Sequence, residues 1–161
     1  ITLHPYLGKE ALQPFLDRVE KGSIILCRTS NPGAGEFQDI PCHSREGGNP
    51  APSEPLYKYI AKKIINDWNH NNNCMLVIGA TYPEELSEIR KIAPNMIFLV
   101  PGIGAQGGNV EKTLLAGLNS QKSGLIINSS RTIVYTSSNE DFAQKAKLKA
   151  RELRDEINKY R

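Results

Sequence analysis

The chain has 161 residues, of which 39% are hydrophobic and 23% are charged, and its formal net charge is +3. These values are ordinary for one soluble globular domain with a buried core. Acids are interspersed among the basic residues of the last segment, and no apolar run reaches the ~18 residues of a membrane span. The sequence therefore predicts neither nucleic-acid binding nor membrane insertion.

Strands and helices are predicted to alternate in five units along the chain. The expected strands are 1–4, 23–28, 74–79, 96–100 and 125–128, and the expected helices are 10–21, 56–69, one opening at 82–85, 110–121 and 139–161. The first helix is expected to end at Gly22, since glycine is favoured just after a helix. The strands are continuous apolar runs, which favours a parallel sheet covered by helices in the α/β class. Because Ile1 already lies in a predicted strand, we expect part of the domain to precede it.

Residues 40–54 interrupt this pattern with three prolines, two glycines and no periodicity. They are predicted to form a disordered surface loop within a single domain covering residues 1–161. Cys42 and His43 are adjacent, and both are residue types that bind metals. Because no further candidate ligands accompany them, they are interpreted as loop residues rather than as a metal site.

The three cysteines, Cys27, Cys42 and Cys74, lie far apart in the sequence and have no zinc-ligand spacing. Cys27 and Cys74 fall in apolar runs, so they are predicted to be free, buried thiols. Free thiols fit a reducing cytoplasm, and no signal peptide is recognisable.

The glycine-rich segment 101–108 carries the strongest indication of function. It follows a predicted strand and precedes a predicted helix, an order that lets backbone N–H groups approach an anion. The next strand ends in Asn128-Ser129-Ser130-Arg131. Backbone donors at one strand end and an arginine at its neighbour predict a phosphate-binding site.

Several segments together resemble the orotidine 5′-phosphate decarboxylase family. They are 5–8, 29–33, 77–86, 89–90 and 101–108, the last reading Pro-Gly-Ile-Gly-Ala-Gln-Gly-Gly as in a bacterial branch of that family. The resemblance covers nearly the whole chain outside 40–54. It implies that the chain is a partial (β/α)8 barrel, or TIM barrel, containing the equivalents of strands four to eight. The family's enzyme is cytoplasmic and homodimeric. That enzyme converts orotidine 5′-phosphate to uridine 5′-phosphate and carbon dioxide with no cofactor and no metal.

The resemblance also assigns substrate-binding residues. Ser30 would bond the pyrimidine and Asn31 would shape its loop, while Gln106 and the Gly107 backbone would hold the phosphate opposite Arg131. Gly108 and Ser130 complete the predicted set. Each has a structural alternative: Ser30 and Asn31 as turn residues before Pro32, Gln106 as a helix cap, and Arg131 as the partner of a surface acid.

The family's catalytic Asp/Lys tetrad has no counterpart, because no Asp-x-Lys-x-x-x-Asp segment is present, so no catalytic residue is assigned. We expect the C-terminal part of a decarboxylase, whose N-terminal half-barrel lies in the full protein or in a separate chain. The alternatives are a non-catalytic remnant, a phosphate-binding α/β domain, and a barrel enzyme for phosphorylated sugars. Residues 43–50 resemble a peptide that palindromic repeats insert in frame into some bacterial genes, so 40–54 is expected to be dispensable.

Overall fold

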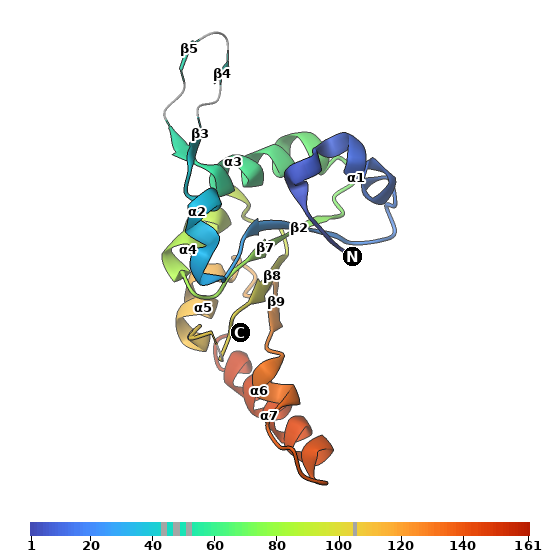
Figure 1. Ribbon diagram of the computed structural model, residues 1–161, viewed down its shortest axis with the longest axis vertical. Helices are drawn as coiled ribbons and strands as arrows, with labels where there is room; N and C mark the ends of the chain where they lie inside the picture. Colours follow the sequence, from blue (N-terminus) through green and yellow to red (C-terminus); the bar gives the residue numbers. More distant parts are fainter. Residues whose placement is uncertain (43–44, 47–48, 51–52, 105) are drawn as a thin grey trace. The chain divides into compact units, whose positions relative to one another are not determined.

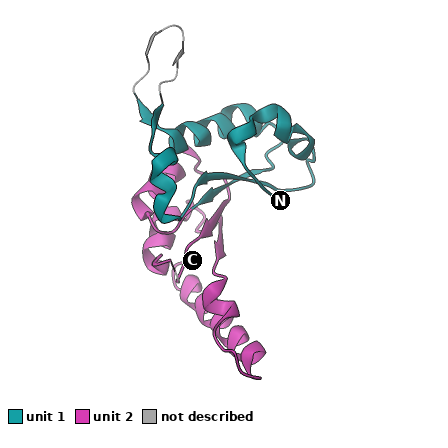
Figure 2. Cartoon of the chain, in the orientation of Figure 1, with its two compact units in different colours: residues 1–78 teal, residues 79–161 magenta. Residues whose placement is uncertain are grey.

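The computed structural model describes residues 1–42, 45–46, 49–50, 53–104 and 106–161 (Figure 1). The chain divides into two compact units, residues 1–78 and residues 79–161 (Figure 2). Both alternate parallel strands with helices, as the α/β prediction requires. Within the described ranges, no helix is both long and apolar enough to cross a membrane.

Unit 1 contains three parallel strands. They are β1 (Thr2–Leu3), β2 (Ser23–Arg28) and β7 (Cys74–Ile78), with β2 in the middle. Thr2 pairs with Ile24, and Ser23 pairs with Cys74. The side chains of Ile25, Leu76 and Ile78 are fully buried. Burial of successive residues such as Leu76, Val77 and Ile78 explains why these runs do not alternate in polarity.

The helices of unit 1 are short. They are η1 (Pro5–Leu7), α1 (Lys9–Leu16), η2 (Pro32–Ala34), α2 (Gly35–Gln38), α3 (Leu56–Lys63) and the π-helical turn η3 (Ile64–Trp68). The predicted helix 56–69 is confirmed as α3 with η3. It buries Tyr57, Ala61, Ile64 and Trp68, which recur at helical spacing.

The prediction that the first helix reaches residue 21 and ends at Gly22 is wrong, because α1 stops at Leu16. The side-chain amide of Asn73 donates to the carbonyl oxygens of Leu16 and Arg18, at 3.0 Å each. The Leu16 carbonyl would otherwise accept an N–H group of the next helical turn. A partner 57 residues away therefore ends the helix, and no local pattern reveals it.

Residues 40–54 begin and end in an antiparallel pair, β3 (Pro41–Cys42) with β6 (Glu54–Pro55). A second pair joins β4 (Arg45–Glu46) to β5 (Asn49–Pro50). These pairings had no sequence signal, because the prolines and glycines mask any periodicity. Residues 43–44, 47–48 and 51–52 lie outside the described residues. The metal site considered for Cys42 and His43 therefore also falls outside the described part of the chain, because it includes His43. The disorder of this segment stays a prediction.

Unit 2 is built on the parallel strands β8 (Phe98–Pro101) and β9 (Leu125–Asn128), with Phe98 opposite Leu125 and Pro101 opposite Asn128. Its helices are α4 (Pro83–Ile92), α5 (Val110–Gly117), α6 (Arg131–Val134) and α7 (Phe142–Asn158). Leu86, Ile89, Phe98, Val100 and Leu114 form its core. The helix expected over 110–121 ends at Gly117, because the Asn119 side chain accepts the N–H groups of Gln121 and Ser123 in a turn.

Arg90 secures the amino ends of both strands of unit 2. Its guanidinium donates to the carbonyl oxygens of Ala93, Pro94, Met96, Gly117 and Gly124, at 2.6–3.3 Å, and lies 3.8 Å from the centre of the Phe98 ring. Burial lowers the pKa of Arg90 to about 10, which still leaves it protonated at neutral pH. Because Met96 lies two residues before β8 and Gly124 directly precedes β9, this one side chain fixes where both strands begin.

Candidate functional site

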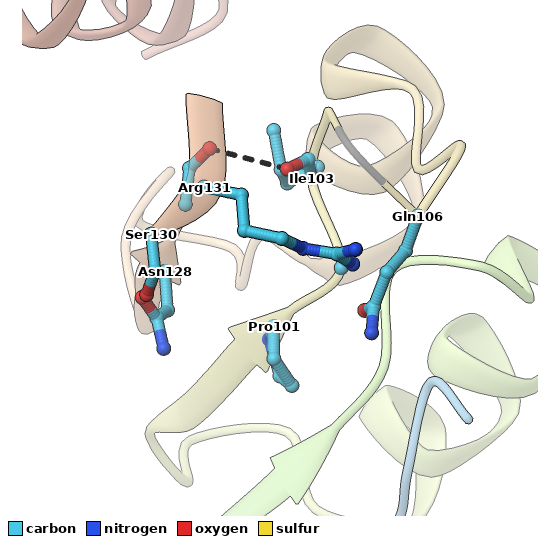
Figure 3. A pocket seen from close by; sticks show the side chains of 8 residues that line it. Pro101, Ile103, Gln106, Asn128, Ser130 and Arg131 are labelled. Atoms are coloured by element: carbon cyan, nitrogen blue, oxygen red, sulfur yellow. Dashed lines mark hydrogen bonds between the residues drawn. The ribbon is translucent and has the colours of Figure 1, made fainter. Parts of the chain in front are cut away.

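A small pocket opens at the carboxyl ends of β8 and β9, within unit 2 (Figure 3). Its volume is about 170 Å³. The residues that line it are Pro101, Gly102, Ile103, Gln106, Asn128, Ser129, Ser130 and Arg131. Arg131 is the one charged residue among them and no acid accompanies it, so the pocket suits an anion.

The glycine-rich segment after β8 folds into a tight loop. Gly102, Gly104 and Gly107 have φ values of 102°, 83° and 88°, a region that side chains disfavour. The N–H of Gly107 donates to the Gly104 oxygen at 2.8 Å, and the N–H of Gly108 donates to the Gly102 oxygen at 3.0 Å. A Cβ atom on Gly108 would lie 2.6 Å from that same Gly102 oxygen. The sequence Gly-x-Gly-x-x-Gly-Gly is therefore required by the loop's own geometry.

The loop contacts the turn that follows β9. The Ser129 hydroxyl donates to the Ile103 carbonyl oxygen at 3.1 Å, and the dashed line in Figure 3 marks this bond. Both residues are buried. A Cβ atom on Gly104 would lie 2.5 Å from the Thr132 hydroxyl oxygen, so the two segments are closely apposed at a second point.

Arg131 begins α6, is exposed, and extends its side chain across the pocket towards Gln106 (Figure 3). The part of the chain that the structure describes gives its guanidinium no ion pair or hydrogen bond. The alternative in which Arg131 pairs with a surface acid is thus not observed there. Gln106 does not cap the following helix, because the Asn109 side chain does so by accepting the Lys112 N–H at 2.9 Å.

The structure brings together three of the predicted site residues, Gln106, Ser130 and Arg131. Gly107 and Gly108 do not line the pocket, and the N–H groups of both are engaged within the loop. A phosphate contact from the Gly107 backbone stays a prediction. The predicted set omitted five lining residues, Pro101, Gly102, Ile103, Asn128 and Ser129. The run 128–131 at the end of a predicted strand signalled the last two.

The remaining predicted residues, Ser30 and Asn31, belong to unit 1. Ser30 follows β2 by two residues and is 7% exposed. Asn31 is exposed, and its carbonyl oxygen accepts the N–H of Ala34 at 3.0 Å as η2 begins. This turn geometry agrees with the structural alternative for Asn31 and does not conflict with a binding role for Ser30.

A larger cavity of about 730 Å³ lies in unit 1 beside α3. Its wall is largely apolar and includes the aromatic side chains of Tyr6, Phe37, Tyr59 and Trp68. Lys63 is the one lysine or arginine in its lining, and it is ion-paired with Asp67. None of the predicted substrate-binding residues lines this cavity, so the smaller pocket of unit 2 is the candidate functional site.

Residues 1–146 match the model of the "Orotidine 5'-phosphate decarboxylase / HUMPS family". A protein of Azoarcus sp. (strain BH72) named orotidine 5'-phosphate decarboxylase is 46% identical over 161 residues, covering 100% of this chain and 56% of that protein. One of the same name from Cellvibrio japonicus is 46% identical over 158 residues, covering 98% and 55%. The chain therefore spans about half the length of the curated relatives it matches.

Solved structures give the same result. Leishmania donovani UMP synthase has a TM-score of 0.81 and 40% identity, covering 100% of this chain and 32% of that one. Leishmania donovani OMP decarboxylase has a TM-score of 0.78 and 38% identity, and the match covers 99% of this chain and 56% of that one. The prediction of an α/β fold equivalent to part of a (β/α)8 barrel is confirmed.

Proposed function

Because the chain belongs to the orotidine 5′-phosphate decarboxylase / HUMPS family, we propose that its pocket in unit 2 binds the 5′-phosphate of orotidine 5′-phosphate and uridine 5′-phosphate. The observation that carries this proposal is the Arg131 side chain, which crosses an acid-free pocket towards Gln106. A planar guanidinium presents two parallel N–H donors to phosphate oxygens, so it suits a phosphate monoester better than a neutral group.

The other lining residues supply neutral donors. The Gln106 amide faces the Arg131 guanidinium from the glycine-rich loop (Figure 3). The Ser130 hydroxyl now donates to the Asn128 side-chain oxygen at 3.2 Å, and it is exposed enough to turn towards a ligand. Charge from Arg131 with neutral donors around it suits a phosphate group.

Ser30 is proposed to bond the pyrimidine, with Asn31 shaping the turn. These residues would give the chain both a base-binding and a phosphate-binding loop, each following the carboxyl end of a strand. Sites in (β/α)8 enzymes lie at those ends. The cytoplasmic location and the association of two copies that the resemblance implies belong to the same proposal.

Decarboxylation requires a proton donor at the carbon that loses carbon dioxide, and the sequence has no Asp-x-Lys-x-x-x-Asp segment to supply it. Six lysines belong to helices rather than to strand ends. They are Lys9 in α1, Lys58, Lys62 and Lys63 in α3, Lys91 in α4 and Lys112 in α5. We therefore assign the proton donor and the aspartates to the portion of the relatives that this chain does not match, in the same polypeptide or in another chain.

The binding proposal is tested by calorimetric titration of the chain with uridine 5′-phosphate and with uridine. We expect the nucleotide to bind and the nucleoside to bind more weakly. Arg131→Ala removes a charged donor and should raise the nucleotide Kd roughly 10- to 100-fold. The matched control is Arg151→Ala, an exposed arginine of α7 away from the pocket, which should leave the Kd unchanged. Equal binding of nucleotide and nucleoside would contradict the proposal.

The assignment of the reaction is tested by orotidine 5′-phosphate turnover. The chain alone should show none, and activity should arise when it is mixed with the N-terminal part of the Azoarcus relative. Turnover by the chain alone would mean that it contains the proton donor. Nucleotide binding without turnover in the mixture would favour the second candidate, a phosphate-binding domain without decarboxylase activity, which the absence of an Asp-x-Lys-x-x-x-Asp segment from the sequence supports.

A further inference from the structure

We propose that Ser129 is a positioning residue, which holds the glycine-rich loop 102–108 at the distance from Arg131 that a phosphate group requires. This inference rests on the proposed function of the pocket. It concerns a residue outside the predicted substrate-binding set, and its argument starts from the loop itself.

Hydrogen bonds join the described residues of the loop, 102–104 and 106–108, to one another. The N–H groups of Gly104, Gly107 and Gly108 donate to the oxygens of Gly108, Gly104 and Gly102, respectively. All of these bonds begin and end inside the loop, so they do not determine where it lies relative to β9. Glycine-rich backbone has high conformational freedom, and a binding loop that is not held in place must lose that freedom when the ligand binds.

The pairing of β8 with β9 ends at Pro101 and Asn128, and the Ser129 hydroxyl extends the connection into the loop. It donates to the Ile103 oxygen at 3.1 Å, between residues 26 positions apart in the sequence. Ser129 is 9% exposed and Ile103 is 5% exposed, so water competes little for this bond. Ile103 is also bridged to Gly108, which transmits the constraint across the loop.

The neighbours of Ser129 explain why its position matters for an anion. Ser130 and Arg131 follow it directly and line the pocket, while Gln106 lies three residues after Ile103 on the opposite wall. Gly104 and Thr132 approach so closely that no side chain fits between them. Ser129 therefore sets the spacing between the Gln106 wall and the Arg131 wall without itself needing to touch the ligand.

The test measures phosphate preference, defined as the Kd for uridine divided by the Kd for uridine 5′-phosphate. Ser129→Ala should lower this preference roughly 5- to 20-fold, since one buried hydrogen bond is lost, while the Kd for uridine stays unchanged. The matched control is Ser137→Ala, whose hydroxyl bonds Asp141 before α7 and should leave the preference unaltered. Melting temperatures of all variants are measured in parallel.

A double-mutant cycle separates positioning from general destabilisation. If Ser129 acts through the placement of the loop relative to Arg131, Ser129→Ala should have little further effect on preference in an Arg131→Ala background. Additive effects, a lower melting temperature with unchanged preference, or equal weakening of nucleotide and nucleoside would each overturn the inference. If Ser129→Ala does not fold, Ser129→Thr and Ser129→Cys take its place. The phosphate preference must then be lower for Ser129→Cys than for Ser129→Thr, because a thiol is a weaker donor than a hydroxyl.

The same measurements distinguish failure of this inference from failure of the proposed function. If the unmodified chain shows no phosphate preference, the proposed function fails, and the role of Ser129 fails with it. If the unmodified chain prefers the nucleotide and Ser129→Ala retains that preference in full, the positioning role alone is overturned.

Discussion

Burial keeps two of the three thiols of this chain protonated. Burial raises the pKa of the Cys27 thiol far above its ordinary range, although a backbone hydrogen bond and the charge of Arg28 act in the opposite direction. Burial likewise raises the pKa of the Cys74 thiol to about 11. Both are free cysteines, and the Cys27 sulfur donates to the Tyr57 oxygen at 3.1 Å. The sequence-based prediction of free, buried thiols at both positions is confirmed.

These shifts predict a loss of stability in alkaline solution. In the unfolded chain the thiols ionise near pH 9, whereas in the folded chain they remain protonated, so the folded state binds more protons above that pH. Their contribution is complete below about pH 9 and declines as the pH rises towards 11 and beyond, by at most ~1.4 kcal/mol per pH unit for each thiol.

Urea denaturation across that range provides the measurement. The free energy of unfolding should fall more steeply with pH for the unmodified chain than for Cys27→Val/Cys74→Ala, in which neither thiol can ionise. Parallel pH profiles would contradict the predicted linkage.

The residues of the pocket were partly predictable, for a reason specific to parallel strands. Neighbouring strand ends meet at one edge of a sheet, so a glycine loop after one run and Arg131 after the next could be placed together. The Ser129–Ile103 bond could not be foreseen, because it depends on the register of β8 against β9 and on the loop's own turn. Pairing in three dimensions, rather than residue type, determines that contact.

Arg90 connects the helices of unit 2 to its strands. Lysine in its place keeps the charge but offers three donors from a single atom, which cannot reach the carbonyls of Gly117, Met96 and Gly124 together. Buried carbonyls without partners, and loss of stacking on Phe98, should lower the free energy of unfolding by roughly 2–4 kcal/mol. Arg90→Lys and the exposed control Arg151→Lys are compared by urea denaturation. A difference of less than about 1 kcal/mol between them would show that the hydrogen bonds of Arg90 contribute little to stability.

The antiparallel pair β3–β6 predicts that the segment between its strands can be removed. Pro41 is opposite Pro55 and Cys42 is opposite Glu54, so the chain leaves and returns at one place. Replacing residues 43–53 with Asn-Gly should change the free energy of unfolding by less than about 1 kcal/mol, because loop length enters only logarithmically. The Lys62–Glu54 ion pair is retained in this variant. A large loss of cooperativity in thermal unfolding would show instead that the removed residues pack against the unit.

Element types were predicted better than element ends. All five parallel strands lie within two residues of their predicted bounds, because continuous apolar runs between turn residues are a strong signal. The ends of α1 and α5 were missed, since side chains of Asn73 and Asn119 terminate them. The short helix α6 was missed because a single turn starting at Arg131 has no periodicity to detect.

The strands at the sheet margins predict self-association of the isolated chain. Among the described residues, β1 pairs only with β2, and β9 pairs only with β8. The outer edges of β1 and β9 therefore have no strand partner. Unpaired strand edges are templates for intermolecular pairing. On β9, the apolar side chain of Ile126 is 44% exposed.

Sedimentation velocity should therefore show a weight-average coefficient that rises with protein concentration. Ile126→Lys places a charge on the margin strand and should reduce this rise. Leu115→Lys removes an even more exposed leucine from helix α5, 71% exposed, and should not. A concentration-independent monomer, or an equal effect of both substitutions, would contradict association through the strand edge.

The position of Arg90 has a consequence for how readily this molecule could acquire new specificity. Its guanidinium bonds carbonyl groups at the amino ends of β8 and β9, whereas the residues that face a ligand lie at the carboxyl ends of the same strands. Folding and recognition thus depend on different sets of side chains within one unit. Mutational libraries at Gln106, Ser130 and Arg131 should yield mostly folded variants, so selection can explore other anionic ligands on an intact scaffold.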